Sequence, residues 1–181
     1  FNIGSFHSGE LKTQMIGKYN FYNFMASIAI GNFFSVDSEL ICEAITSYVP
    51  TNNRSQVIEK GSVKFIMDAY NANPSSMKSA LESFAMIEQS NKKVILGDMF
   101  ELGDQSFMEH EQILNLLTSL KLNGVMIGNH FFEHASKFPN FKFFPSKNEF
   151  VAGFKIEDFD NQLVLVKGSR GIGLEQLLEL F

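Results

Sequence analysis

Short apolar runs rich in β-branched residues alternate with longer helical patterns over most of the chain beyond residue 55. This alternation predicts strands at 56–59, 63–67, 94–96, 124–127, 142–144 and 163–166. It predicts helices between them at 74–89, 107–120, 131–137 and 147–154, with a short closing helix from Leu174. Such spacing favours right-handed crossovers and a mainly parallel sheet with helices on both faces. We therefore expect an α/β, Rossmann-like fold whose first two strands, joined by a short turn, form an antiparallel hairpin.

The first fifty residues follow a different pattern. Apolar side chains recur at helical spacing over 21–34 and 40–48, which predicts a helical pair. Pro50 and the polar residues after it break this pattern, so we place a domain boundary near Pro50. Residues 1–15 alternate apolar and polar side chains like the last part of a sheet, and the chain does not begin with methionine. We interpret the sequence as a piece of a longer protein.

Composition and charge exclude several classes of protein. The 181 residues are 45% hydrophobic, which is enough for one buried core, or for one domain with part of another. The 15 basic and 20 acidic residues give a net charge of -5, which argues against nucleic-acid binding. No apolar run of about 18 residues is present, so we expect no membrane span. The single cysteine, Cys42, has no disulfide partner and lies in an apolar pattern, which favours a core position in a cytoplasmic protein.

Polar clusters follow three of the predicted parallel strands. They are Asp68-Ala69-Tyr70-Asn71-Ala72-Asn73-Pro74, Leu96-Gly97-Asp98-Met99-Phe100-Glu101-Leu102-Gly103 and Lys167-Gly168-Ser169-Arg170-Gly171. The carboxyl ends of parallel strands share one edge of the sheet, where ligands bind in open α/β folds. Asn73 is placed to cap the helix from Pro74, while Lys167 and Arg170 supply positive charge for a carboxylate or phosphate. Each cluster alone is typical of ordinary turns, but the three together favour a binding site.

Familiar nucleotide and metal motifs are missing from the sequence. No Gly-x-Gly-x-x-Gly follows the first parallel strand, and no Gly-x-x-x-x-Gly-Lys-Ser/Thr phosphate loop is present. Ser106 and Glu109 predict a capping box at a helix start, so we interpret His110 in the first turn as structural. His130 and His134 are one helical turn apart but lack the glutamate of a zinc motif, which favours a surface or packing role.

Taken in order, the three clusters resemble the C-terminal domain of the Mur ligases. Upstream, Gly17-Lys18-Tyr19-Asn20-Phe21-Tyr22-Asn23 resembles the family segment that closes the central ATPase domain, although Tyr19 stands where the family has histidine. Asn53-Arg54-Ser55-Gln56 resembles the turn between these two domains. The resemblance covers nearly the whole chain. It implies that residues 1–50 end the central ATP-binding domain and that residues 51–181 form the C-terminal domain.

Within the family, residues 70–74 are most similar to members that join D-Ala-D-Ala to UDP-N-acetylmuramoyl-tripeptide in peptidoglycan synthesis. These ligases make an acyl phosphate from ATP with magnesium. The resemblance implies that the nucleotide is bound by Asn20, Asn23, Arg54, Asp68 and Tyr70. It implies that the dipeptide pocket is formed by Asn71, Asn73, Asp98, Lys167, Ser169 and Arg170.

The resemblance also implies a division of labour between this chain and the rest of a ligase. The phosphate loop, the magnesium ligands and the UDP-sugar site would precede Phe1, so we expect no catalytic residue here and no activity from this chain alone. Our hypothesis is a lid that delivers the dipeptide amine to the acyl phosphate and excludes water. Two alternatives stay open: a sister Mur ligase that adds another amino acid, and a non-catalytic Rossmann-like interaction module.

Overall fold

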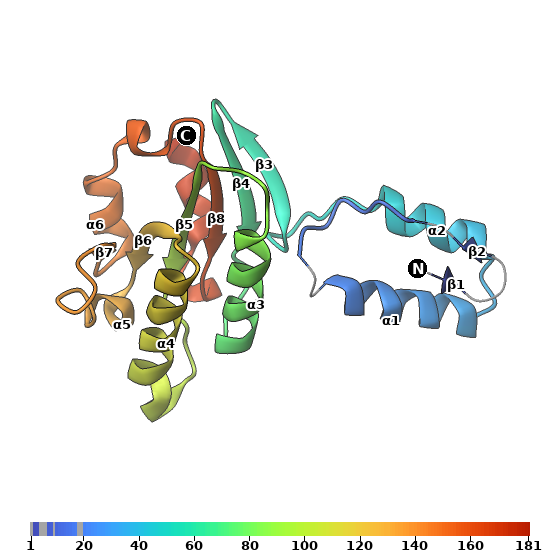
Figure 1. Cartoon of the computed structure of the whole chain (residues 1–181), viewed down its shortest axis with the longest axis horizontal. Coiled ribbons are helices and arrows are strands. Elements are labelled where there is room, and N and C mark those ends of the chain that lie inside the picture. Colours follow the sequence, from blue (N-terminus) through green and yellow to red (C-terminus); the bar gives the residue numbers. More distant parts are fainter. Residues whose placement is uncertain (1, 4–6, 9, 18–19) are drawn as a thin grey trace.

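The computed structural model describes residues 2–3, 7–8, 10–17 and 20–181. Its centre is a six-stranded sheet in the order β3-β4-β8-β5-β6-β7 (Figure 1). The strands are β3 (Gln56–Lys60), β4 (Val63–Asp68), β5 (Lys92–Gly97), β6 (Asn123–Ile127), β7 (Lys142–Phe144) and β8 (Leu163–Lys167). The strand β3 pairs with β4 in antiparallel register, and the other neighbours are parallel. The predicted α/β fold, with its opening hairpin, is confirmed.

Helices cover both faces of this sheet. The longer ones are α3 (Pro74–Ala85) and α4 (Ser106–Ser119), and the shorter ones are α5 (Asn129–Phe132) and α6 (Lys147–Ala152). The described residues also include the 3-10 segments η1 (Gly103–Gln105), η2 (Ile156–Phe159), η3 (Arg170–Ile172) and η4 (Leu174–Leu180). Figure 1 shows α3 and α4 lying side by side in front of the sheet.

Two apolar cores, one on each face, hold these layers together. On the first face, Leu81 of α3 and Leu114 of α4 pack with Leu96 of β5, and all three are fully buried. On the second face, Phe150 of α6 and Leu177 of η4 pack against strand residues of the alternate register. Because strand side chains alternate between faces, β4, β5 and β8 can supply both cores and read as continuous apolar runs.

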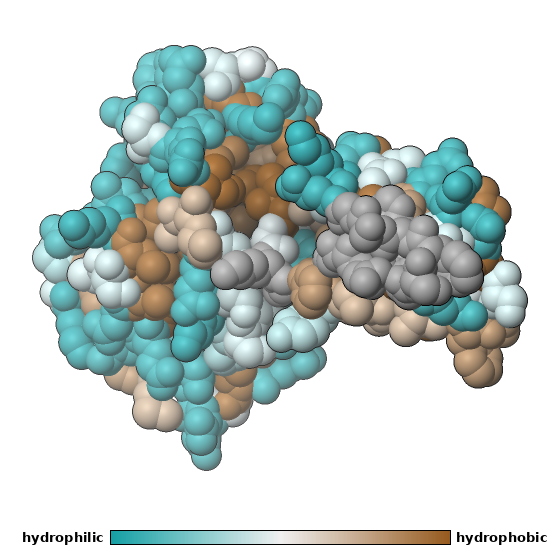
Figure 2. Space-filling view, turned by 45° about the vertical axis from the view of Figure 1, so that its right-hand side comes forward, coloured by the Kyte–Doolittle hydropathy of each residue, from teal (hydrophilic) through white to brown (hydrophobic). Residues whose placement is uncertain are grey.

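The N-terminal part forms a separate helical pair, α1 (Asn20–Phe33) and α2 (Ser38–Ser47), which extends to one side in Figure 1. Cys42 is buried in the small core between these helices, as predicted. Many large apolar side chains of the pair stay exposed, including Tyr22, Phe33 and Phe34. Brown and tan surface appears along this part of Figure 2.

The beginning of the chain differs from the expected sheet edge. The strands β1 (Asn2–Ile3) and β2 (His7–Ser8) pair with each other in antiparallel register, and residues 10–17 contain no strand. Part of the alternating pattern, residues 1, 4–6 and 9, lies outside the described residues, as does Tyr19.

Strand positions agree with the prediction to within two residues, and helix positions do so as well except in α3 and α5. The helix α3 ends at Ala85 rather than at residue 89, because the Lys92 ammonium donates to the carbonyls of Phe84, Ala85 and Ile87. The helix α5 covers 129–132 instead of 131–137, and turns follow it. The helix α6 ends at Ala152 instead of residue 154, with Gly153 at its C-cap.

The capping box predicted from Ser106 and Glu109 is wrong. The helix α4 starts directly from the 3-10 turn η1, so Ser106 is its first residue and Gln105 is the N-cap, without a side-chain bond. Asn73, in contrast, caps α3 as predicted: its Oδ1 accepts from the Ser76 amide at 2.9 Å. Among the described helices, none has the length and apolar content needed to cross a membrane.

Gly124 gives a test of the packing between β5 and β6. A Cβ at this position would overlap the carbonyl oxygen of Val94 on the neighbouring strand. We expect Gly124→Ala to lower the free energy of unfolding by roughly 2–3 kcal/mol, because backbone must move to accept the methyl group. Gly153→Ala is the matched control, because its Cβ would lie 3.3 Å from the Phe144 ring and would require only a small shift of that side chain. Equal urea midpoints for both variants would contradict this account.

Candidate functional site

The three polar clusters meet at one edge of the sheet, as predicted. Asp68 at the end of β4 lies opposite Lys167 at the end of β8, and Lys167 lies opposite Leu96 of β5. The Ser169 amide donates to the Asp98 carbonyl at 3.0 Å, which joins the second and third clusters. The strand order β4-β8-β5 therefore brings together chain segments that are far apart in the sequence. We call this edge the rim.

Asp68 and Lys167 form a buried ion pair at the centre of the rim. The Lys167 Nζ lies 2.7 Å from Asp68 Oδ2, and the two side chains are 14% (Asp68) and 3% (Lys167) exposed. The same ammonium donates to the Asn71 carbonyl at 3.2 Å. The charge of Lys167 is thus matched inside the chain, which differs from the solvated lysine that an isolated turn would carry.

Asp68 is also linked to the N-terminal helices. Its second oxygen, Oδ1, accepts from the Ser55 amide at 3.2 Å. The Ser55 hydroxyl accepts from Asn20 Nδ2 at 3.5 Å, and Asn20 Oδ1 accepts from Asn23 Nδ2 at 3.1 Å. Asn20 is buried at this junction. The structure therefore connects three of the residues that the sequence assigns to nucleotide binding, Asn20, Asn23 and Asp68.

Tyr70 lies close to two guanidinium groups. The Arg54 Cζ is 3.8 Å from the centre of the Tyr70 ring, and the Arg170 Cζ is 5.3 Å from it. Both distances are typical of cation–π contacts. Tyr70 is 40% exposed, so this cationic and aromatic group is accessible at the rim.

A pocket of about 410 Å³ opens beside Tyr70. Its lining combines the first and third clusters with the loop after β5, through Asn71, Asn73, Ser169, Arg170, Phe100 and Glu101. Arg170 and Glu101 give this pocket one positive and one negative side chain. We call it the first rim pocket. Sequence reasoning did not single out Glu101, although its charge within the second cluster was a usable signal.

Asp98 faces inward rather than toward the first rim pocket. It is 2% exposed, and its two oxygens accept from the amides of His130 and Phe131 at 3.0 and 2.9 Å. These are the second and third amides of α5, so the carboxylate stabilises the first turn of this short helix. Asp98 also lines a second rim pocket of about 470 Å³, which includes His130, Lys147 and Gly171. Of these four residues, the sequence analysis assigned only Asp98 to binding.

His110 is structural, as expected, but not as part of a capping box. The ring is fully buried, and its Nε2 lies 3.0 Å from the Met99 amide nitrogen, which donates to it. Its Nδ1 lies 2.7 Å from the Ser106 carbonyl. Burial lowers the pKa of His110 below the usual value for histidine. The imidazole is therefore neutral at pH 7 and fixes the loop after β5.

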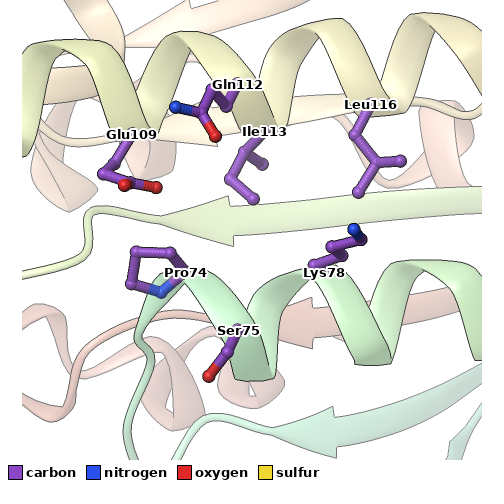
Figure 3. Close-up of a pocket in the computed structure, with 7 residues that line it drawn as sticks. All are labelled: Pro74, Ser75, Lys78, Glu109, Gln112, Ile113 and Leu116. Atoms are coloured by element: carbon purple, nitrogen blue, oxygen red, sulfur yellow. The ribbon is translucent and has the colours of Figure 1, made fainter.

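A third pocket lies between α3 and α4, away from the strand ends. Figure 3 shows Pro74 and Lys78 of α3 facing Ile113 and Leu116 of α4 across it. Its volume is about 410 Å³, similar to the first rim pocket. It draws on one pair of neighbouring helices, whereas the rim pockets combine several strand ends. The rim is therefore the stronger candidate. Within the described residues, no three His, Cys, Asp or Glu side chains are grouped to hold a metal ion.

The ion pair at the rim makes a clear prediction for stability. Lys167→Met removes the partner of a buried carboxylate, so we expect the free energy of unfolding to fall by about 3–5 kcal/mol. Lys64→Met is the matched control, because its pair with Glu59 is exposed and should contribute less than about 1 kcal/mol. Urea denaturation measures both. A loss at Lys167 no larger than that at Lys64 would show that the pair does not hold the rim.

Comparison with known proteins gives matches that include residues from all three polar clusters of the rim. The family model described as "Mur ligase, glutamate ligase domain" matches residues 53–170. The chain is 30% identical to the UDP-N-acetylmuramoyl-tripeptide--D-alanyl-D-alanine ligase of Bacillus subtilis, over 91% of this chain and 38% of that protein. The corresponding ligase of Rickettsia prowazekii is 28% identical, over 88% of this chain and 36% of its own length.

Solved structures show the same relationship. MurF from Acinetobacter baumannii has 29% identity and a TM-score of 0.76, covering 90% of this chain and 37% of that one. MurF ligase from Thermotoga maritima, solved in complex with ADP, has 22% identity and a TM-score of 0.71, which shows a shared fold. It covers 92% of this chain and 38% of that one. The chain thus spans less than two fifths of each of these four relatives, and it belongs to the Mur ligase family.

Proposed function

We propose that this chain is the C-terminal part of an ATP-dependent ligase that joins D-Ala-D-Ala to UDP-N-acetylmuramoyl-tripeptide in peptidoglycan synthesis. The relatives that carry this name match about nine tenths of the chain. The observation that carries the proposal is the first rim pocket, where Arg170 and Glu101 place opposite charges among hydrogen-bonding groups. A free dipeptide carries a carboxylate and an amine, so such a pocket fits it.

The dipeptide is proposed to bind with its carboxylate at Arg170. A guanidinium can bind a carboxylate through two parallel hydrogen bonds, which fixes the orientation of the dipeptide as well as its position. Asn71 and Ser169 add polar groups to the same pocket. Lys167 acts indirectly, because its ammonium is already held by Asp68 and the Asn71 carbonyl. Asn73 lines this pocket and caps α3, whereas Asp98 acts further away, by holding the start of α5 beside the second rim pocket.

The nucleotide is proposed to bind at the junction of Asn20, Asn23, Arg54, Asp68 and Tyr70. The MurF ligase of Thermotoga maritima, which shares the fold, was solved in complex with ADP. Within the described residues, the Asp68 carboxylate accepts two hydrogen bonds, one from Ser55 and one from Lys167, and a carboxylate has about four acceptor positions. Acceptor capacity therefore remains for ribose hydroxyls. The exposed part of the Tyr70 ring that Arg54 does not cover offers a surface for the base.

The chain is proposed to work as a lid. The activated acyl phosphate would be made from ATP with magnesium. The magnesium ligands would come from the part of the relatives that this chain does not match. The residues of the rim would hold the dipeptide amine within attack distance and exclude water during closure. We place the hinge near Pro50, between the helical pair and β3. On this view the chain alone has no ligase activity.

Arg170→Gln tests the dipeptide site in the full-length protein. Loss of a charge-assisted contact should raise the KM for D-Ala-D-Ala by roughly 10- to 100-fold, while the KM for ATP changes little. Lys78→Gln, an exposed change on α3, is the control and should leave both constants unchanged. Steady-state release of phosphate at varied dipeptide measures this. An unchanged KM for the dipeptide would place its carboxylate elsewhere. A wild-type protein that does not use D-Ala-D-Ala would favour a sister ligase with a different amino acid.

Tyr70→Leu tests the nucleotide site. Removal of the ring should raise the KM for ATP by roughly three- to tenfold, because stacking on an aromatic ring contributes about 0.5–1.5 kcal/mol. Tyr48→Leu is the control, since Tyr48 is also exposed but lies at the end of α2. If the two variants have the same KM for ATP, the base does not lie on Tyr70.

A further inference from the structure

Three histidines gather beneath the loop that follows β5. His110 of α4 and His134, just beyond α5, are buried, and His130 of α5 is half-buried. The ring of His110 lies 5.3 Å from that of His130 and 4.6 Å from that of Phe131. The proposed ligase reaction uses none of these histidines directly. His110 bonds to the loop after β5, which lines both rim pockets, and this contact gives His110 another role.

The hydrogen bonds of His110 define its protonation state. The Met99 N–H donates to Nε2, so this nitrogen carries no proton. The single proton of the neutral ring is then on Nδ1, where it is donated to the Ser106 carbonyl at 2.7 Å. Both ring nitrogens are used, and one of the two bonds reaches from α4 to the loop after β5.

The residue next to Met99 connects this bond to the ligand pockets. Phe100 lines both the first and the second rim pocket. Its amide donates to the Ser169 hydroxyl at 2.9 Å. Its ring lies against Gly171, where an added Cβ would come within 2.9 Å of it. The Met99 amide is held by His110 and the Phe100 amide by Ser169. These two bonds fix the backbone that carries the Phe100 ring, which lines both rim pockets.

We propose that His110 is a positioning residue, whose neutral Nε2 holds Met99 and thereby sets Phe100 between the two rim pockets, and whose protonation releases this loop. Where the loop shapes the dipeptide pocket, this inference rests on the proposed function. The anchoring itself does not depend on which ligand is bound.

Protonation of His110 at Nε2 would break its hydrogen bond with the Met99 amide. A proton on Nε2 would face the Met99 N–H, and two donors cannot share a hydrogen bond. The nearest charged acceptor is Asp98 Oδ1, 3.7 Å from Nε2, which already accepts from the Phe131 amide. Asp98 favours the protonated ring, whereas His130 and His134 oppose it when charged. Burial outweighs the Ser106 carbonyl and Asp98, which both favour the protonated ring, so the pKa of His110 stays below its usual value and the ring is neutral at pH 7.

The pH dependence follows from the direction of this shift. Because burial lowers the pKa of His110 in the folded chain, the unfolded chain takes up the proton first as the pH falls. We call the hydrogen bond between His110 and Met99 the anchor. Its contribution to the stability of the fold is complete above about pH 6.5 and is lost as the pH falls from there toward the lower folded pKa of His110. The Met99 amide should therefore lose protection in acid.

Amide hydrogen exchange of the 181-residue chain tests the anchor without any ligand. The protection factors of Met99 and Phe100, corrected for the intrinsic pH dependence of exchange, are measured between pH 5 and pH 8 by NMR. We expect His110→Leu to lower them roughly 10- to 100-fold at pH 7.5. His110→Gln should stay near wild type, because its Oε1 can accept from Met99, and it should lose the acid dependence. His134→Gln is the control, since the Nε2 of His134 makes no hydrogen bond within the described part of the chain.

Several results would overturn the inference. They are unchanged protection in His110→Leu, an equal loss in His110→Gln, and wild-type protection that does not fall in acid. If His110→Leu does not fold, the glutamine variant and the wild-type titration still decide the question. In the full-length ligase, His110→Leu should raise the KM for D-Ala-D-Ala with little effect on that for ATP. A full-length protein without ligase activity would refute the proposed function, while the exchange data would still judge the anchor.

Discussion

The ion pair between Asp68 and Lys167 sets the geometry of the rim. The two residues close adjacent parallel strands in register, and the lysine is nearly inaccessible to water. Desolvation offsets much of the attraction in a buried pair, so its main effect is positional: each charge is costly to bury without the other. The ends of β4 and β8 are therefore tied together. Because Lys167 also binds the Asn71 carbonyl, the pair holds the turn that forms one wall of the first rim pocket.

Ser169 extends this arrangement to the second cluster. Its hydroxyl accepts from the Phe100 amide and donates to the Ala72 carbonyl at 3.4 Å, while its own amide donates to the Asp98 carbonyl. One small buried side chain thus contacts the loops that follow β4 and β5 from its own position after β8. A hydroxyl suits this place because it donates and accepts at once. The rim is a connected hydrogen-bonded unit rather than three independent turns.

Much of this architecture could be predicted from local sequence signals. Strand periodicity, the short turn before β4 and the Asn73 cap act within a few residues, and all three are confirmed. The meeting of the clusters followed from the parallel sheet. The partner of Lys167 could not be predicted, because Asp68 is 99 residues away and becomes its neighbour only through the strand order. The bond from His110 to Met99 was missed for a similar reason, since the expected capping box suggested a local role.

The helical pair and the rim are joined by bonds of unequal length, which bears on the proposed lid. The Asp68 carboxylate accepts from the Lys167 ammonium at 2.7 Å and from the Ser55 amide at 3.2 Å. The Ser55 hydroxyl accepts from Asn20 Nδ2 at 3.5 Å. The longest contact in this series is the one between the helical pair and the rest of the chain. A hinge at that point would change the nucleotide junction and leave the ion pair intact. The dipeptide pocket would then move as a preformed unit, so closure would not require its residues to be ordered anew.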